Sequence, residues 1–240
     1  MIARKWVLAW CVPAIVCLVA CGTAEPAEQN GDEGNVVERE ETDYYPMIVG
    51  DSWTYEEKDT YNNTTTLVYE VVDKESIDFG SETGEREVFV VENTLPDKGE
   101  EFRTQYIEDD GVRAVRHRHL IYDKTGTLTK ERNFVPGFLR FDRSKMNKGE
   151  SWTEDVTKYS DALDGLGVQS TKTKYQYEVM AVDEQVTVAA GTFSCVRIRR
   201  SEVFGSEVKD YYFGHGVGKV KEVTEGVKTE ELVRYRLAAE

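Results

Sequence analysis

From Tyr44 to the C-terminus the chain consists of short runs rich in Val, Tyr, Thr and Phe, without long helical periodicity. Many of these runs are bounded by Gly, Asn, Asp or Ser, which is the pattern of strands joined by turns. In one run Tyr175, Tyr177 and Val179 alternate with polar residues, and alternation places such side chains on one face of a strand. The pattern predicts an all-β fold of antiparallel sheets, curved or closed because free strand edges invite aggregation.

Nine runs carry this signal most clearly. They are residues 67–72, 87–91, 102–107, 112–122, 174–182, 193–198, 208–213, 217–223 and 232–237. Further strands are expected at Trp53 and Trp152, because each follows a Gly turn. Residues 160–167 are predicted as a short helix or a loop.

The β region contains an internal repeat. Gly50-Asp51-Ser52-Trp53-Thr54 is matched 99 residues later by Gly149-Glu150-Ser151-Trp152-Thr153. Three more landmarks follow in the same order, at offsets of 108, 107 and 105 residues: Tyr69-Glu70-Val71 with Tyr177-Glu178-Val179, Gly84 with Gly191, and Tyr106 with Tyr211. The shared order favours two tandem related β units, at 44–138 and 139–240, over chance similarity. The expected architecture is a half-barrel or open barrel, with 44–240 as two units or one continuous domain.

The first twenty residues have the composition of a targeting segment. Arg4 and Lys5 precede an apolar run of 15 residues, Trp6 to Ala20, which Pro13 interrupts. A membrane-spanning helix needs roughly 20 apolar residues, so this run is short for one. A basic start, a short apolar run and small residues at its end predict a secretory signal peptide at 1–20.

The end of that run, Leu18-Val19-Ala20-Cys21, resembles the lipobox of bacterial lipoproteins. The resemblance implies that Cys21 is lipidated, carries acyl chains such as palmitate, and becomes the new N-terminus. Several acyl chains would hold the protein at a membrane without a spanning helix. Gly22 in place of Asp implies, by resemblance to Gram-negative lipoproteins, the outer membrane. The alternatives are an ordinary signal peptide with an incidental Cys, or an uncleaved anchor.

Residues 21–43 are predicted to be the lipidated Cys followed by an acidic flexible linker. Residues 22–43 hold eight acidic residues and one basic residue, too polar to offset the entropy of ordering. The whole chain has 30 basic and 45 acidic residues, and signal removal leaves 28 and 45, a net charge of −17. That charge argues against nucleic acid as a partner and against electrostatic docking onto anionic lipid.

The second half carries longer motifs. Val186 to Cys195 ends in Ala-Gly-Thr-Phe-Ser-Cys, and Tyr211-Tyr212-Phe213 precedes Gly216-Val217-Gly218. Together with Tyr44-Tyr45-Pro46 before Trp53, these motifs resemble landmarks of uncharacterised β-rich bacterial envelope lipoproteins, although Ala189 stands where Pro is common. The resemblance implies curved antiparallel sheets and brings no settled activity.

No catalytic set is predicted. His117 and His119 lie two residues apart, so on a strand both would share a face, but a metal site needs more ligands. His215, between two glycines, has no nucleophile supplied by a motif, and Cys195 is interpreted as a small core residue. We therefore predict no catalytic residue, no metal and no cofactor.

The sequence favours a lipid-anchored cell-envelope protein that is not an enzyme. Its expected role is binding or scaffolding, with an apolar ligand in a cavity between curved sheets as one form of it. Its partners are predicted to be the membrane, through the lipid, and an unidentified protein or apolar ligand. The alternatives are a surface interaction protein with a solid core, and a hydrolase of unfamiliar type that uses carboxylates or His117 and His119.

Overall fold

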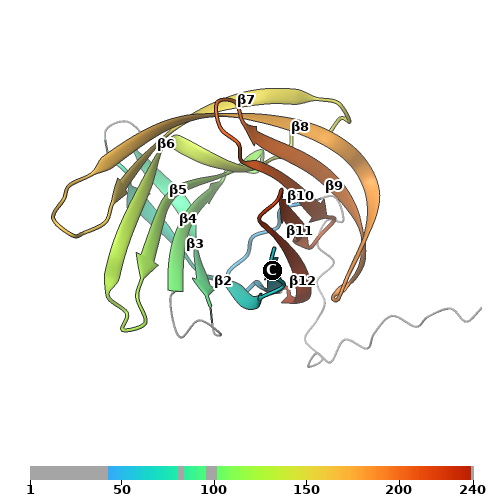
Figure 1. The fold of residues 1–240 in the computed structure, drawn as a ribbon, viewed down its shortest axis with the longest axis horizontal. Coiled ribbons are helices and arrows are strands. Elements are labelled where there is room, and N and C mark those ends of the chain that lie inside the picture. The colour runs from blue at the N-terminus through green and yellow to red at the C-terminus, as the bar shows by residue number, and fades with distance from the viewer. Residues whose placement is uncertain (1–42, 81–83, 96–101, 239–240) are drawn as a thin grey trace, which may run out of the picture. The chain divides into compact units, whose positions relative to one another are not determined.

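Twelve strands make up most of the residues that the computed structural model describes, which are 43–80, 84–95 and 102–238 (Figure 1). In chain order they are β1 (Ser52–Asp59), β2 (Thr64–Asp78), β3 (Glu85–Thr94), β4 (Phe102–Asp109), β5 (Arg113–Tyr122), β6 (Leu128–Asp142), β7 (Ser151–Asp161), β8 (Gln169–Val188), β9 (Gly191–Glu202), β10 (Val208–Gly214), β11 (Gly218–Thr224) and β12 (Lys228–Arg236). Within the described part of the chain, no helix is long and apolar enough to cross a membrane.

Each strand pairs antiparallel with the next one in the chain, and β1 also pairs with β12, so the sheet closes into a barrel. The all-β antiparallel prediction is therefore confirmed. The expectation of a half-barrel or open barrel is corrected, because Ser52 to Asp59 find a hydrogen-bonding partner in Lys228 to Arg236. Closure leaves neither strand as an exposed edge.

The two halves of the barrel repeat one local geometry. Trp53 lies opposite Tyr69, and Trp152 lies opposite Tyr177. The turn before each of these tryptophans is also fixed in the same way. The N–H of Gly50 donates to the Val71 carbonyl at 2.7 Å, and the N–H of Gly149 donates to the Val179 carbonyl at 2.8 Å. Strands β1–β6 and β7–β12 thus each supply half of one sheet, and their origin by duplication stays a prediction.

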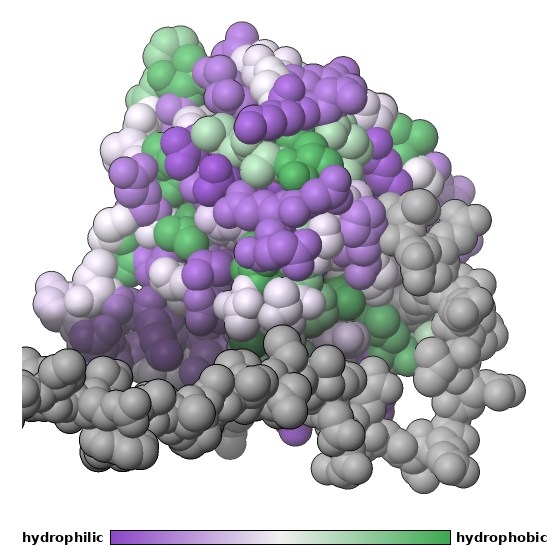
Figure 2. Space-filling view, turned by 90° about the vertical axis from the view of Figure 1, so that its right-hand side faces the viewer, coloured by the Kyte–Doolittle hydropathy of each residue, from purple (hydrophilic) through white to green (hydrophobic). Residues whose placement is uncertain are grey.

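The inner face of the barrel is apolar over much of its area. On β1, Trp53 and Tyr55 are buried, whereas Glu56 is exposed, as period-two alternation requires. The largest fully buried side chains of the core include Phe141, Leu232, Val71, Val179 and Val196. Figure 2 shows one outer face, where hydrophilic side chains dominate and hydrophobic ones are scattered. The core therefore lies within the barrel rather than between separate sheets.

Two stretches differ from the strands drawn from the sequence. β6 runs through Pro136 and was not among the predicted runs. Gly137 is required there, because a Cβ would come within 2.2 Å of the Val115 Cγ1. Of the predicted helix or loop at 160–167, Ser160 and Asp161 continue β7, and the rest is a loop with bends at 163–166.

Candidate ligand-binding site

The segment just before β1 packs against the barrel core. We call residues 43–48 the N-terminal strap. The Tyr45 ring stacks on Phe141 with centroids 5.9 Å apart and meets the edge of Phe213 at 5.8 Å. The Tyr44 hydroxyl lies 2.5 Å from the His215 Nε2. These ring contacts place the strap over the apolar interior.

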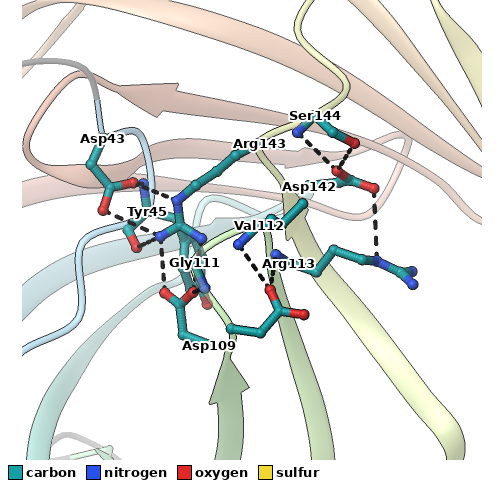
Figure 3. Close-up of polar contacts among 10 residues, drawn as sticks. Asp43, Tyr45, Asp109, Gly111, Val112, Arg113, Asp142, Arg143 and Ser144 are labelled. Carbon is teal, nitrogen blue, oxygen red and sulfur yellow. Dashed lines mark hydrogen bonds and ion pairs between the residues drawn. The ribbon is translucent and has the colours of Figure 1, made fainter.

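Arg143, just after β6, fastens the strap to the barrel (Figure 3). Its Nε and Nη2 donate to the Asp43 carboxylate, and its Nη1 and Nη2 donate to the Asp109 carboxylate at 2.9 Å. Nη2 also donates to the Tyr45 carbonyl at 2.8 Å. Hydrogen bonds to these two carboxylates raise the pKa of Arg143, although burial opposes the rise. One side chain thus joins the strap, β4 and β6.

A cavity of about 60 Å³ lies beneath the strap. Its walls include Tyr45, Trp53, Tyr55, Tyr69, Arg140 and Lys219. The polar atoms of two of these rings are already paired, because the Trp53 Nε1 donates to the Val217 carbonyl at 2.6 Å and the Tyr55 hydroxyl donates to the Lys219 carbonyl at 2.8 Å. These two rings therefore offer a ligand only apolar surface.

Lys219 is the charged centre next to this cavity. Its Nζ lies 3.0 Å from the Glu222 Oε2 and 2.5 Å from the Glu230 Oε1, and Glu222 also pairs with the Lys209 Nζ at 2.8 Å. The ammonium lies 4.9 Å from the Tyr55 ring centroid. Burial lowers the pKa of Lys219, but Glu222 and Glu230 more than offset this, so the pKa lies well above its ordinary value. Two cations and two carboxylates form a neutral buried network.

His117 and His119, which the sequence analysis considered as a pair, have different neighbours in the structure. The His117 Nε2 lies 2.8 Å from the Glu108 Oε2, and the ring packs 5.0 Å from Phe79. His119 lies opposite Gln105 in the next strand, beyond a β-bulge. The two rings therefore share no partner. In the described ranges, no three His, Cys, Asp or Glu side chains gather as metal ligands would.

The other residues singled out from the sequence also have definite positions. Cys195 is fully buried, and burial raises the pKa of its thiol to about 12. His215 contacts Tyr44 of the strap, so it helps to hold the strap against the barrel. Cys21 and the signal peptide lie outside the described residues.

Sequence reasoning did not single out Arg140, Arg143 or Lys219. Arg140 lies between two large apolar residues, Leu139 and Phe141, and Lys219 lies between Gly218 and Val220. In a strand that pattern is usually an outward-facing charge. A charge between two buried neighbours is a weak signal for Arg140 and Lys219, and Arg143, between Asp142 and Ser144, has no such signal.

His119 gives a measurable pH dependence. Burial, and then the positive charges of Arg116, Arg132, Arg103 and Arg140, lower the pKa of His119 to about 2. An unfolded His titrates near 6.5, so below that pH the unfolded state binds the extra proton. His119 therefore lowers the free energy of unfolding by about 2 kcal/mol as the pH falls from 7 to 5.

NMR titration checks the histidine prediction. The ring signals of His119 should stay constant from pH 8 to pH 4.5, and His119→Phe should lose about 2 kcal/mol less than the wild type between pH 7 and pH 5. A ring that titrates with a midpoint between pH 5 and 7 contradicts the neutral, buried state.

The fold and this site define the chain as a closed antiparallel β-barrel with an aromatic cavity under an N-terminal strap. No protein-family model matches the sequence, and no curated protein matches it. Among solved structures, the barrel is similar to a protein thought to be exported, with a YmcC-like fold, from Bacteroides fragilis. The identity is 13%, the match covers 80% of this chain and 98% of that one, and the TM-score is 0.50.

A second solved structure, a protein thought to be a lipoprotein from Parabacteroides distasonis, has 14% identity and a TM-score of 0.45. It too matches 80% of this chain and 98% of its own. At this identity the similarity to the Bacteroides fragilis protein establishes a shared fold and nothing about activity.

Proposed function

We propose that this chain is a lipid-anchored protein of the bacterial cell envelope that binds a small apolar or aromatic ligand inside its barrel. The observation that carries the binding role is the cavity between Trp53, Tyr55, Tyr69 and the strap. The signal sequence and the lipobox at Cys21 support the anchor. The neighbour from Bacteroides fragilis, itself thought to be exported, agrees with an envelope location.

The size of the cavity limits the ligand. A water molecule needs about 10–15 Å³, and an apolar cavity of about 150 Å³ admits benzene. At 60 Å³ the resting cavity falls between these, so a ring-sized ligand enters only if Tyr45 or Met47 moves. Both belong to the strap, whose release would enlarge the cavity without breaking the β-ladder.

Trp53 can report this binding directly. After signal removal Trp53 and Trp152 are the only tryptophans, so Trp152→Phe leaves Trp53 as the sole fluorophore. We expect benzyl alcohol to shift and quench its emission saturably, because the indole forms part of the cavity wall. The matched control is Trp53→Phe, whose Trp152 stacks on Tyr177 and should respond weakly. An unsaturable, equal response of both variants counts against the cavity.

The anchor has an independent test. Metabolic labelling with a palmitate analogue should mark the wild type and not Cys21→Ser, because only the first has the thiol that receives lipid. Fractionation of the labelled protein with the outer membrane would support the sorting inferred from Gly22. Labelling of both proteins would contradict lipidation at Cys21.

Two alternatives make different predictions. A surface interaction protein with a solid core should show no saturable response at Trp53 and should crosslink reproducibly to one protein partner in cells. A hydrolase that uses His117 and His119 has less support, because the two rings have different neighbours.

A further inference from the structure

Two guanidinium groups in the barrel wall form no direct ion pair with a carboxylate of the described residues. Arg116 on β5 lies 4.7 Å from the Phe134 ring centroid and 5.0 Å from that of Phe138, and it donates to the neutral Gln105 Oε1 at 3.0 Å. Arg140 lines the cavity and hydrogen-bonds the Tyr45 side chain. Burial lowers the pKa of Arg140, but Tyr45, Tyr211 and the more distant Glu222 raise it above its ordinary value. Among the described residues no carboxylate oxygen lies within 4.0 Å of either guanidinium, and each Nε is buried without a hydrogen-bond partner.

Nearby arginines show that this is not a general property of the wall. Arg200, whose guanidinium also lies 5.0 Å from Phe138, pairs with the Glu207 carboxylate. Lys219 has two carboxylates of its own. Arg200 and Lys219 thus differ from Arg116 and Arg140, because each has a carboxylate at ion-pair distance.

His119 adds a third unpaired donor. Its side chain is only 5% exposed, and neither ring nitrogen has a hydrogen-bond partner. It lies opposite Gln105, the residue that also accepts from Arg116. Burial and Arg140 both lower the pKa of Arg116, to about 9. Buried donors and unpaired like charges cost free energy unless a counter-ion satisfies them.

The structure assigns to Arg116, Arg140 and His119 an anion-binding site, which we propose receives the carboxylate or phosphate group of a small amphiphilic ligand. A guanidinium holds either oxyanion through paired N–H donors, and the imidazole N–H adds a further one. Arg140 joins the two parts of the site, because it also lines the aromatic cavity. Ile107, another wall residue, pairs in register with Arg116. The inference that the ligand has an apolar part thus rests on the proposed function. The anion site is inferred independently, from the contacts of Arg116, Arg140 and His119.

The test compares charged and neutral probes on the complete chain in an uncharged detergent. Inorganic phosphate and acetate, each against chloride at equal ionic strength, report on the anion site through the Tm. Benzyl alcohol reports on the cavity through Trp53, and benzoate reports on both. The variants are Arg116→Met and Arg140→Met, and the control is Arg199→Met, whose guanidinium pairs with Asp210 at the surface.

We expect benzoate to bind at least tenfold more tightly than benzyl alcohol in the wild type and in Arg199→Met. At about 100 times its Kd it should raise the Tm by about 5–10 °C. In Arg116→Met and Arg140→Met the preference for benzoate should fall to about one. Circular dichroism identifies a variant that fails to fold, and the probe comparison in the wild type decides the question without any variant.

The remaining outcomes overturn one or both of the two proposals. Equal binding of benzoate and benzyl alcohol in the wild type, or a preference that survives in both variants, overturns the anion site and leaves the cavity. A Tm rise with phosphate or acetate that Arg116→Met abolishes, without any response at Trp53, supports the anion site and overturns the apolar cavity. No response to any probe overturns both.

Discussion

Replacing Arg143 by methionine should lower the Tm by about 6–12 °C, because Asp43 and Asp109 lose their ion-pair partner and the strap loses its attachment to the barrel. The side chain is 22% exposed and makes five hydrogen bonds, to Asp43, Asp109 and the Tyr45 carbonyl. Breaking a buried ion pair costs about 3–5 kcal/mol, and we take the lower end because Asp43 is partly exposed. For a domain of this size each kcal/mol shifts the Tm by about 2–4 °C.

Thermal unfolding and chymotrypsin cleavage together measure this effect. Release of the strap should expose the peptide bond after Tyr44, so cleavage there should become faster in Arg143→Met, whereas the bond after Tyr45 resists chymotrypsin because Pro46 follows it. The matched control is Arg236→Met, which removes an arginine 69% exposed beside Glu70 and should change the Tm by no more than 1–2 °C. If both variants unfold and are cleaved alike, Arg143 does not hold the strap.

The strands could be predicted wherever alternation and turn residues agreed, and β6 shows where they did not. Asn133-Phe134-Val135-Pro136-Gly137 has the composition of a turn, because Pro lacks an N–H and Gly weakens a strand. In the structure Arg118 pairs with Asn133, and Arg116 pairs with Phe138. The residues between therefore bulge out of the ladder with β5, so this ladder does not need the donor that Pro136 lacks.

Barrel closure could not be predicted because alternation reports which face a residue occupies and not which strand it pairs with. Ser52 lies opposite Arg236, almost the full length of the domain away. That pairing depends on the summed twist of all the intervening strands.

The candidate site was missed for a related reason. Arg140 and Lys219 both lie at β-bulges, where the register passes from Ala114–Phe141 to Val115–Leu139 and from Tyr212–Lys221 to Phe213–Lys219. A bulge redirects side chains, so simple alternation gives the wrong direction for residues beside it. The histidines drew attention by their chemistry, and only His119 became part of the proposed site.

Replacing Lys219 by methionine should produce the largest pH-dependent loss of stability in this protein. Lys219 neutralises Glu230, whose side chain is 3% exposed. Glu222 would still pair with Lys209 in the variant. An uncompensated buried charge costs about 3–5 kcal/mol, which corresponds to a Tm lower by about 6–20 °C at pH 8. Lys219→Met combined with Glu230→Gln should recover most of the loss, since the stranded charge is then gone.

The pH dependence identifies the cause. In the wild type burial raises the pKa of Glu222, but Lys219 and Lys209 overcome this and hold it well below its usual range. Its contribution is therefore present above about pH 4.3 and lost as the pH falls further. In Lys219→Met a buried carboxylate without its cation favours the neutral form as the pH falls, so the Tm difference from the wild type should narrow between pH 8 and pH 5. A deficit that stays constant over that range would mean that lost packing, and not an unpaired carboxylate, destabilises the variant.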